Sequence, residues 1–425
     1  MDLPARNYCE PGPRATAFGA ERLDREQIGA IERQVIATAR LPLRQAVTLP
    51  RAAYVNEDYF RHEAGKVLAS GWICLAHVSQ LKQAGSYLAL DLLDEPLLVT
   101  RAPDGPVRVL SRVCPHRGAD IMHPGFGVAP RGVAKRLVCP YHVWSFGLDG
   151  KLKTCAEMQR AEAFDKKDWA LVELRSAVWE GFVFVNLDGT ASPLAEQYAD
   201  FAKVVAPWNC AEMEVAIELD WECEFNWKVM VENWMESYHH MGIHHDTLQT
   251  TMPAKMTWTE AENPHFIRCH LPFKQAVADE LMEAIAEGRP IPGFRPIEGL
   301  TLRDHVEWGL YLGHPCFMFL TMRDRVLWYR LQPISAERCR LMTATLVSKR
   351  ATQAPDFAET VERETRMLAE FHAQDMKVNT AVQAGLRSSR AVQGRLSHLE
   401  EPVWMIQRYV AARLQGCHPG MDRLR

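Results

Sequence analysis

Two short segments that each pair a cysteine with a histidine constrain this chain more than any other feature. The first is Cys114-x-His116, and the second, after 22 intervening residues (117 to 138), is Cys139-x-x-His142. Together they offer two thiolates and two imidazoles, which is the donor set of a metal centre. Each segment is mixed, because it carries one sulfur donor and one nitrogen donor.

The donor set matches a Rieske [2Fe–2S] centre, in which one iron takes both sulfurs and the other takes both nitrogens. A structural zinc site can use the same ligands, but the zinc pattern normally pairs Cys with Cys and His with His. Chance spacing is the remaining alternative in a chain with 11 Cys and 16 His. We therefore predict that a [2Fe–2S] cluster is held by Cys114, His116, Cys139 and His142.

Length and composition limit the classes of protein to consider. A chain of 425 residues indicates two or three domains, at ~150 residues per domain. The net charge of −4 and the pI near 6.5 provide no basic field for nucleic acid or an anionic membrane. No stretch reaches the ~18 consecutive apolar residues of a transmembrane helix. The first residues carry charge and proline where a signal peptide is apolar. With its scattered, reduced cysteines, we expect the protein to be cytoplasmic.

Strand-like and helix-like segments are segregated along the chain. Residues 20–40 have helical apolar spacing, and a hairpin signal at Pro103-Asp104-Gly105 lies among short β-rich runs. Further β runs lie at 177–189, 215–227 and 318–334, and helical stretches lie at 226–241 and 354–386. This segregation predicts an α+β fold.

We divide the chain into three parts on this pattern. Residues 1–50 form a helical lead-in, residues 51–175 an all-β domain that holds the cluster, and residues 176–425 a second domain. There is no GxGxxG segment after a strand, hence no built-in nicotinamide or flavin module. Electrons for the cluster are therefore expected from another protein.

A second group of metal-binding side chains runs from Glu232 to His245, with four histidines and two carboxylates within 14 residues. A mononuclear Fe(II) that activates O2 is commonly held by two His and one carboxylate on one face. Spacing alone leaves three histidine pairs open, namely 239 with 244, 240 with 244, and 240 with 245. The alternative is a histidine cluster that only interacts with a helix dipole or with solvent.

Taken together, these motifs resemble the large, or alpha, subunit of Rieske non-haem iron oxygenases. The matching residues are the two cluster segments with Trp144, then Asn226-Trp227-Lys228, then Glu236-x-x-His239-x4-His244. The resemblance spans roughly residues 50 to 410. It implies an all-β Rieske domain followed by a helix-grip (START-like) catalytic domain with an antiparallel sheet and C-terminal helices.

The resemblance selects His239 and His244 as ligands of a mononuclear Fe(II). The third ligand of the family is an Asp on a C-terminal helix, and the segment 373–377 is similar to that region, which points to Asp375. Other carboxylates compete for this role, namely Glu370, Glu364, Glu362 and Asp246. Each ligating histidine needs a partner at its other nitrogen, and the candidates are Tyr238, Asn233 and Asn226.

Two features depart from the usual family pattern. The loop between the cluster segments, which contains GVAPRGVAKR, is several residues longer than in many relatives. The bridging acid is Glu236, where many members have Asp. By the resemblance, Glu236 joins His142 of one chain to His239 of the next in a head-to-tail homotrimer, with a small beta subunit possible. The alternative is an ordinary helix-surface carboxylate.

The implied function is that of a terminal oxygenase component, a mono- or dioxygenase. A ferredoxin and/or flavin reductase supplies electrons, so NAD(P)H acts only indirectly, and O2 is activated at the Fe(II). The bridging Glu, the chain length and the lead-in are similar to the branch that N-demethylates quaternary ammonium and N-methyl compounds. Twelve tryptophans offer material for an aromatic cage around a methylammonium.

Two other functions stay open. An aromatic acid could be hydroxylated or O-demethylated, and for that substrate we expect an Arg or Lys in the pocket, with Arg303, Arg323 and Arg325 as candidates. The chain could also be a non-catalytic Rieske redox carrier or sensor with a degenerate second domain.

Overall fold

The largest element of the fold is an antiparallel sheet of seven strands in the order β11-β17-β16-β15-β14-β13-β12. The computed structural model describes residues 22–417. The strands are β11 (Glu214–Cys223), β12 (Trp258–Thr259), β13 (Phe266–Pro272), β14 (Glu307–Gly313), β15 (Phe317–Thr321), β16 (Val326–Ser335) and β17 (Arg338–Val347). They are rich in Val, Leu, Phe, Trp and Tyr, which suit a pleated and buried surface. The β runs expected at 215–227 and 318–334 correspond to β11, β15 and β16.

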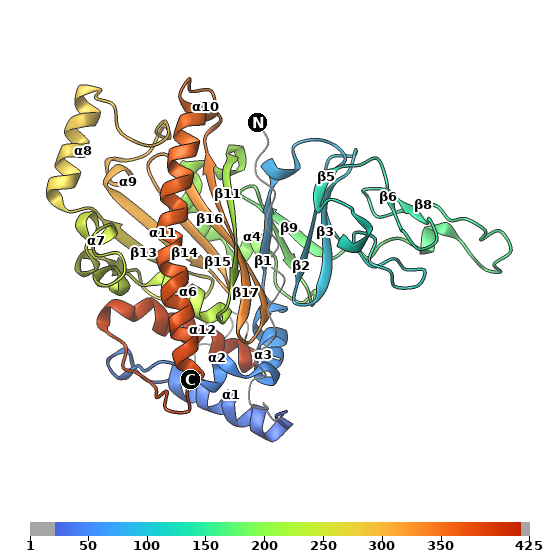
Figure 1. Ribbon diagram of the computed structural model, residues 1–425, viewed down its shortest axis with the longest axis horizontal. Helices are drawn as coiled ribbons and strands as arrows, with labels where there is room; N and C mark the ends of the chain where they lie inside the picture. Colours follow the sequence, from blue (N-terminus) through green and yellow to red (C-terminus); the bar gives the residue numbers. More distant parts are fainter. Residues whose placement is uncertain (1–21, 418–425) are drawn as a thin grey trace.

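A 30-residue helix, α11 (Phe357–Leu386), crosses one face of this sheet (Figure 1). Helix α6 (Trp227–Met235) contacts both α11 and strands β14 and β16. The buried positions of α11 recur every three or four residues, as one helical face requires. All of them except Leu368 are polar, namely Thr360, Glu364, His372, Asp375, Asn379 and Gln383. Because buried polar groups are costly unless they are partnered, this row of polar side chains indicates a functional site on this face of α11.

The cluster segments lie in a separate lobe that projects from the large sheet (Figure 1). It contains a four-stranded sheet, β4-β3-β2-β5, and a three-stranded sheet, β6-β7-β8. Their bounds are β2 (Ser86–Leu92), β3 (Glu95–Arg101), β4 (Val107–Ser111), β5 (Arg131–Val133), β6 (Leu137–Val138), β7 (Ser145–Phe146) and β8 (Leu152–Thr154). The hairpin expected at 103–105 joins β3 to β4. The long loop between the cluster segments supplies β5, which pairs with β2 at the sheet edge.

A third small sheet, β1-β10-β9, connects the sequence before and after this lobe. Strand β1 (Ile73–His77) pairs with β10 (Phe182–Asn186), which pairs with β9 (Arg175–Trp179). The chain thus enters and leaves the lobe through neighbouring strands. The division at residue 175 stays a prediction, since β9 and β10 share their sheet with β1. The α+β class is confirmed, because an all-β lobe accompanies a large antiparallel sheet packed with helices.

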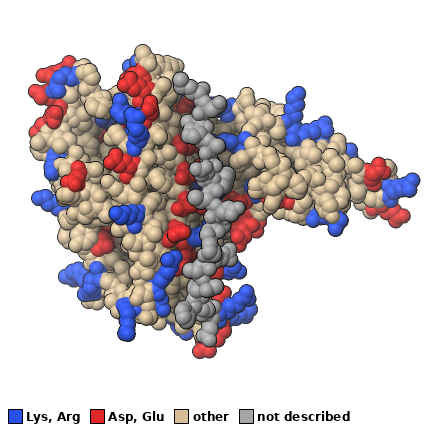
Figure 2. Space-filling view, in the orientation of Figure 1, with Lys and Arg blue, Asp and Glu red and all other residues tan. Residues whose placement is uncertain are grey.

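The helices at the two ends of the described chain pack together. Helix α1 (Arg25–Ala39), expected at 20–40, contacts α12 (Glu401–Leu414), and α2 (Ala52–Val55) contacts α11. The start of the predicted lead-in and of the charged N-terminal segment, residues 1–21, lies outside the described residues. Within residues 22–417, no helix is long and apolar enough to cross a membrane. Acidic and basic side chains are interspersed on the face in Figure 2, as expected from the small net charge.

The motif Asn226-Trp227-Lys228 fastens α6 to the neighbouring elements. Lys228 Nζ donates to Glu63 Oε2 at 2.5 Å, and both side chains are fully buried. Trp227 Nε1 donates to the same carboxylate at 3.0 Å. Asn226 caps α6 through Lys228 N–H and donates to the carbonyl of Tyr54 at 3.2 Å. Removing one partner of such a buried pair destabilises a fold by about 3–5 kcal/mol, so this motif is structural and sets the position of α6.

The helix expected over 226–241 is shorter in the structure. Helix α6 ends at Met235, and Glu236 has extended φ and ψ angles of −110° and 146°. A 3-10 turn, η8 (Tyr238–Met241), follows. The Glu236 carboxylate accepts the backbone N–H of His239 at 3.0 Å, so it satisfies a free donor at the start of that turn. This break turns His239 and His244 toward α11.

Candidate active site

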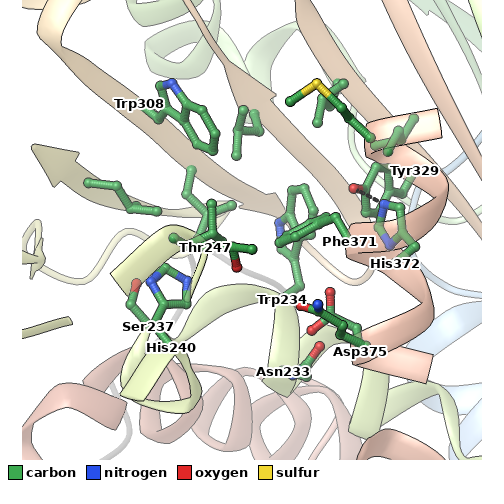
Figure 3. A pocket seen from close by; sticks show the side chains of 18 of the residues that line it. Asn233, Trp234, Ser237, His240, Thr247, Trp308, Tyr329, Phe371, His372 and Asp375 are labelled. Carbon is green, nitrogen blue, oxygen red and sulfur yellow. Dashed lines mark hydrogen bonds between the residues drawn. The ribbon is translucent and has the colours of Figure 1, made fainter. Parts of the chain in front are cut away.

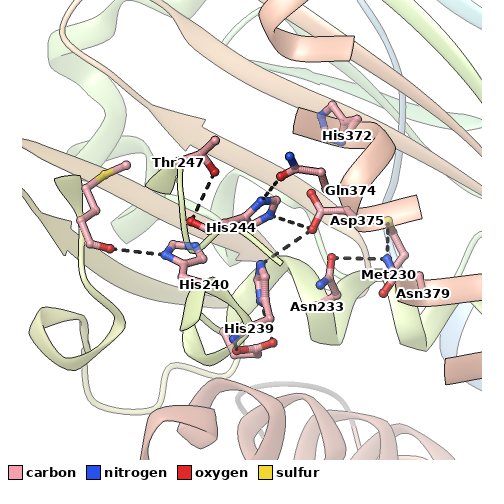
Figure 4. Close-up of polar contacts among 12 residues, drawn as sticks. Met230, Asn233, His239, His240, His244, Thr247, His372, Gln374, Asp375 and Asn379 are labelled. Atoms are coloured by element: carbon pink, nitrogen blue, oxygen red, sulfur yellow. Dashed lines mark hydrogen bonds and ion pairs between the residues drawn. The ribbon is translucent and has the colours of Figure 1, made fainter. Parts of the chain in front are cut away.

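His239, His244 and Asp375 meet between α6 and α11 (Figure 4). Their donor atoms all lie within 4.8 Å of one another. The Nε2 atoms of His239 and His244 lie 3.8 Å and 3.1 Å from Asp375 Oδ1. Two imidazoles and one carboxylate on one side of a site suit a ferrous iron with positions left open. These three residues therefore fit a mononuclear iron, and Asp375 is brought to the histidines from 131 residues along the chain.

Each histidine of the triad has its second ring nitrogen held by a different kind of partner. His239 Nδ1 lies 2.7 Å from Glu236 Oε1, and His244 Nδ1 lies 2.7 Å from Gln374 Oε1. Both oxygens accept, so each Nδ1 donates and each Nε2 is left for the metal. Burial would lower the pKa of His239, but the hydrogen bond and charge of Glu236 outweigh it and raise the pKa. Glu236 thus makes His239 more basic than an ordinary imidazole.

The other candidate histidines point elsewhere. His240 Nδ1 lies 3.4 Å from the carbonyl of Met252, and burial, with the charge of His239, lowers the pKa of His240 to about 3. His245 pairs with Asp246 at 3.0 Å, and both side chains are well exposed. The structure therefore combines 239 with 244, out of the three pairs that spacing left open.

The competing carboxylates of α11 are engaged or exposed. Glu364 accepts from Arg325 Nη1 at 2.6 Å, and Glu362 forms an exposed pair with Arg366. Glu370 is exposed at the edge of the cavity described below. None of these three belongs to the group around His239 and His244 in the described chain.

Sequence reasoning missed Gln374, which holds His244, and only one of its three candidate partners for the ligating histidines lies at the site. Asn233 does lie at the site, where it accepts a hydrogen bond from Asn379 at 3.3 Å. Tyr238 is 46% exposed and Asn226 caps α6, so neither holds a ligating histidine. Gln374 had one usable signal, which is its place directly before Asp375 on the helix that supplies the third ligand.

Replacing Gln374 with Leu is expected to weaken iron binding at the triad. The Leu side chain has a similar volume but cannot accept the hydrogen bond from His244 Nδ1. The ring therefore loses its fixed tautomer and orientation. Loss of such a partner typically costs 10–100-fold in metal affinity. Titration of the metal-free triad with Fe(II) measures the effect. Gln374→Glu, which keeps an acceptor, should bind iron more tightly than the Leu variant, and equal affinities would contradict this role.

The two cluster segments form matching turns in the projecting lobe. Gly118 N–H donates to the Cys114 carbonyl at 2.9 Å, and Val143 N–H donates to the Cys139 carbonyl at 3.1 Å. Gly118 and Val143 both have positive φ, at 74° and 59°. Each turn thereby places its cysteine inside and its histidine at the lobe surface. The two segments, far apart in sequence, are brought face to face.

The four side chains of these turns fit an iron–sulfur cluster. Cys114 and Cys139 are 1% and 2% exposed, and the rings of His116 and His142 lie 4.7 Å apart. In the described chain, His142 Nδ1 is buried without a protein partner, so it is available to a metal. Burial, together with the neighbouring Cys139, raises the pKa of the Cys114 thiol to about 11. Coordination to iron removes this cost, because a metal-bound thiol is deprotonated.

A cavity of about 310 Å³ adjoins the triad and lies between α11 and the face of the large sheet (Figure 3). Its walls include the aromatic rings of Trp234, Trp308, Tyr329 and Phe371. The rings of Trp234 and Tyr329 lie 4.3 Å apart, and Phe371 stacks on His244 at 4.6 Å. Ligand pockets of this size and lining are typical of small-molecule sites.

The cavity wall also carries polar side chains, two of which are bonded to each other. Tyr329 OH is hydrogen-bonded to His372 Nε2. Burial lowers the pKa of His372 to about 4, so this imidazole is neutral near pH 7. Beyond the triad, the acidic and basic side chains of the wall are Glu236, Arg325, Glu364 and the exposed Glu370.

Family models match both parts of the chain. The ring hydroxylating alpha subunit (catalytic domain) matches residues 196–416, which is more than half of the chain. The Rieske [2Fe–2S] domain matches residues 71–165. The chain belongs to the Rieske oxygenase alpha subunits. The family predicted from the sequence is confirmed, together with its Rieske [2Fe–2S] cluster and its mononuclear iron site.

Curated relatives of this Rieske oxygenase subunit act on quaternary ammonium compounds. The carnitine monooxygenase oxygenase subunit of Acinetobacter pittii is 34% identical over 197 residues, which cover 46% of this chain and 52% of the relative. The glycine betaine monooxygenase oxygenase subunit of Pseudomonas aeruginosa is 27% identical over 231 residues, covering 54% of this chain and 51% of the relative. The matches thus span about half the length of these relatives.

Solved structures share the fold over nearly the whole chain. A quaternary ammonium Rieske monooxygenase superposes with a TM-score of 0.73 at 24% identity, covering 90% of this chain and 98% of that one. Naphthalene 1,2-dioxygenase from a Rhodococcus species gives a TM-score of 0.73 at 17% identity, covering 92% and 98%. Because the two differ in substrate, the fold alone does not select one.

Proposed function

We propose that this chain is a terminal oxygenase that N-demethylates a quaternary ammonium or N-methyl compound. A ferrous iron, when bound, supplies the activation of O2 that organic side chains lack. One oxygen atom enters a C–H bond of the N-methyl group, and the other leaves as water after two electrons and two protons are consumed. The resulting carbinolamine breaks its C–N bond and releases formaldehyde.

The observation that carries this proposal is that Arg325 is already bonded to two buried carboxyl groups. It is the one Lys or Arg that lines the cavity among the described residues. Its guanidinium donates twice to Asp324, at 3.0 Å and 2.9 Å, and once to Glu364 at 2.6 Å. These carboxylates are only 2% and 7% exposed. A guanidinium already compensated by two buried carboxylates offers little to an incoming carboxylate, which argues against the aromatic-acid alternative.

The other two arginines considered for that alternative are also engaged. Arg303 donates to Glu307 at 3.0 Å and lies near Trp258 rather than in the cavity. Arg323 donates to the carbonyl of Pro292. The aromatic walls, in contrast, suit a methylammonium, because ring faces attract a cation by about 0.5–2 kcal/mol each.

The residues around the iron have separate tasks in this proposal. His239, His244 and Asp375 would hold the iron, Glu236 and Gln374 fix the two rings, and the rings of Trp234 and Phe371 provide apolar walls. The cluster residues Cys114, His116, Cys139 and His142 would receive electrons one at a time from a ferredoxin or flavin reductase.

We extend the proposal to a homotrimer in which electrons cross between subunits. Within one chain, β6, which ends directly before Cys139, lies in the projecting lobe, whereas α11 with Asp375 lies across the large sheet (Figure 1). The half-buried His142 stands at the lobe surface. This separation supports a route from the lobe of one subunit to Glu236 of the next, and a head-to-tail contact of this kind closes into a ring.

Product analysis tests the proposed reaction. The reconstituted protein, supplied with NADH, a generic ferredoxin and its reductase, is incubated with separate panels of N-methyl compounds and aromatic acids. We expect formaldehyde and the demethylated amine in equal amounts with one or more N-methyl compounds, and no product from the aromatic acids. Ring-hydroxylated products, or formaldehyde from O-methyl arenes alone, would reject the N-demethylase assignment.

A further inference from the structure

The cavity follows one face of α11 for three turns. From Glu364 to Asp375, the helix contributes lining residues at 364, 367, 368, 370, 371, 372, 374 and 375. Eleven steps of about 1.5 Å correspond to roughly 16 Å along the helix axis. The iron ligand Asp375 and the ion pair of Glu364 therefore mark two ends of an elongated space.

The opposite wall is a row of leucines that crosses the sheet. Leu310 of β14 is paired with Leu320 of β15, and Leu320 with Leu327 of β16, all three lining the cavity. The row ends at Thr345 of β17, the partner of Leu327. Since alternate residues of a strand face the same side, Met322 and Tyr329 extend this wall next to Leu320 and Leu327. The wall between the two ends is thus almost entirely apolar.

The two ends differ in chemistry. One end holds the triad, of which Figure 3 shows Asp375, with the rings of Trp234 and Phe371 in the same wall. At the other, Arg325 and Glu364 satisfy each other at 2.6 Å. Burial would lower the pKa of Arg325, but Asp324 and Glu364 outweigh it and raise the pKa, so the guanidinium stays charged and bonded to these two carboxyl groups. Exposed lining residues, Thr247, Met367 and Glu370, mark where the cavity meets solvent.

The size of the space exceeds what a compact betaine fills. A volume of about 310 Å³ holds on the order of ten or more water-sized groups. A small zwitterion at the iron would leave water against the leucines and would find no uncompensated cation for its carboxylate. An apolar chain instead gains from each methylene that leaves water, by about fourfold in affinity.

From these dimensions we infer that the substrate is an N-methylated amine with an extended, unbranched apolar chain. The methylated nitrogen lies at the triad, and the chain runs along the leucine row toward Arg325 and Glu364. This inference rests on the proposed N-demethylation and narrows its substrate class from quaternary ammonium and N-methyl compounds in general to those that carry a long alkyl chain.

A homologous series of N,N-dimethylalkylamines and alkyltrimethylammonium ions, from ethyl to dodecyl, tests the inference. Calorimetry gives the Kd for each member without any electron supply, and formaldehyde release gives kcat/KM. We expect Kd to fall, and kcat/KM to rise, by up to about fourfold per methylene until the chain spans the cavity. A Kd and kcat/KM that are flat or worsen with chain length would overturn the inference.

The series also separates this inference from the proposed function. Formaldehyde from the ethyl member or from glycine betaine, without any gain for longer chains, keeps the N-demethylase and rejects the long-chain substrate. Absence of formaldehyde from every N-methyl compound, with products from arenes, rejects both.

A substitution in the middle of the leucine row tests where the alkyl chain of the substrate lies. Leu320→Trp fills space between the two ends, and we expect the ratio of kcat/KM for dodecyl over ethyl to fall by at least about tenfold, since about two methylenes of contact suffice for that loss. Leu302→Trp is the matched control, because Leu302 is 71% exposed and does not line the cavity; its ratio should equal that of the parent. An unchanged ratio of kcat/KM in a folded Leu320→Trp protein would mean that the alkyl chain does not lie along the leucine row.

Discussion

Replacing Asp375 with Ala is expected to remove the mononuclear iron and to abolish turnover while leaving the cluster in place. Asp375 provides the one carboxylate of the triad, and it lies 3.1 Å from His244 Nε2. Without it, only the two imidazole ligands remain, and a hard anionic ligand for Fe(II) is lost. We expect iron affinity at this site to fall by more than the roughly 10–100-fold that a lost outer partner costs, and turnover to fall at least 100-fold with it.

Iron counting and the visible spectrum measure the two sites separately. The parent should hold about three irons per chain, two in the cluster and one at the triad, and the variant should lose one while keeping the cluster absorption. Glu362→Ala is the control, because Glu362 lies on the same helix in an exposed pair with Arg366. If parent and variant both hold two irons, the chain is a redox carrier or sensor and not an oxygenase.

The short-range features of this site are predictable from sequence. Cys114 with His116, and His239 with His244, sit close together in the chain, so spacing and ligand chemistry are enough to find them. The segregation of strands and helices along the chain likewise predicts the α+β class. What spacing left open was the choice among neighbours such as His240, which depends on where α6 ends. The break at Glu236 arises from its own side-chain bond to His239 N–H, and helical periodicity alone does not contain it.

Spacing alone does not find the long-range features of the site, and only the family resemblance points to Asp375 in the sequence. Asp375 is 131 residues from His244, and helical spacing on α11 cannot distinguish it from Glu370 or Glu364. Gln374 escaped notice because an amide beside a carboxylate carries no signal of its own. The leucine row depends on the register of β14, β15 and β16, and register is fixed by packing and turns that sequence patterns do not resolve.

Replacing Glu236 with Gln is expected to preserve all the irons and to slow electron transfer and turnover by about 10–100-fold, the usual effect of weakening a partner of a ligating histidine. Gln has nearly the same shape but one accepting oxygen, so it can keep only one of the two hydrogen bonds that Glu236 accepts from His239, for example the one from the backbone N–H at 3.0 Å. It lacks the negative charge that lies 2.7 Å from His239 Nδ1. Charge-assisted hydrogen bonds are roughly twice as strong as neutral ones, so the hold on His239 and its basicity both weaken.

Stopped-flow oxidation of the reduced cluster, with substrate and O2 present, separates the possible roles of Glu236. A slow oxidation with full iron content places Glu236 on the electron route to the triad, as the trimer proposal requires. Loss of iron together with activity would mean that Glu236 only holds His239 in place. Glu224→Gln is the control, since Glu224 is exposed just before α6 and should oxidise at the parent rate. An unchanged rate in Glu236→Gln would mean that Glu236 is not on the electron route. There would then be no reason to expect His142 of one subunit next to Glu236 of the next.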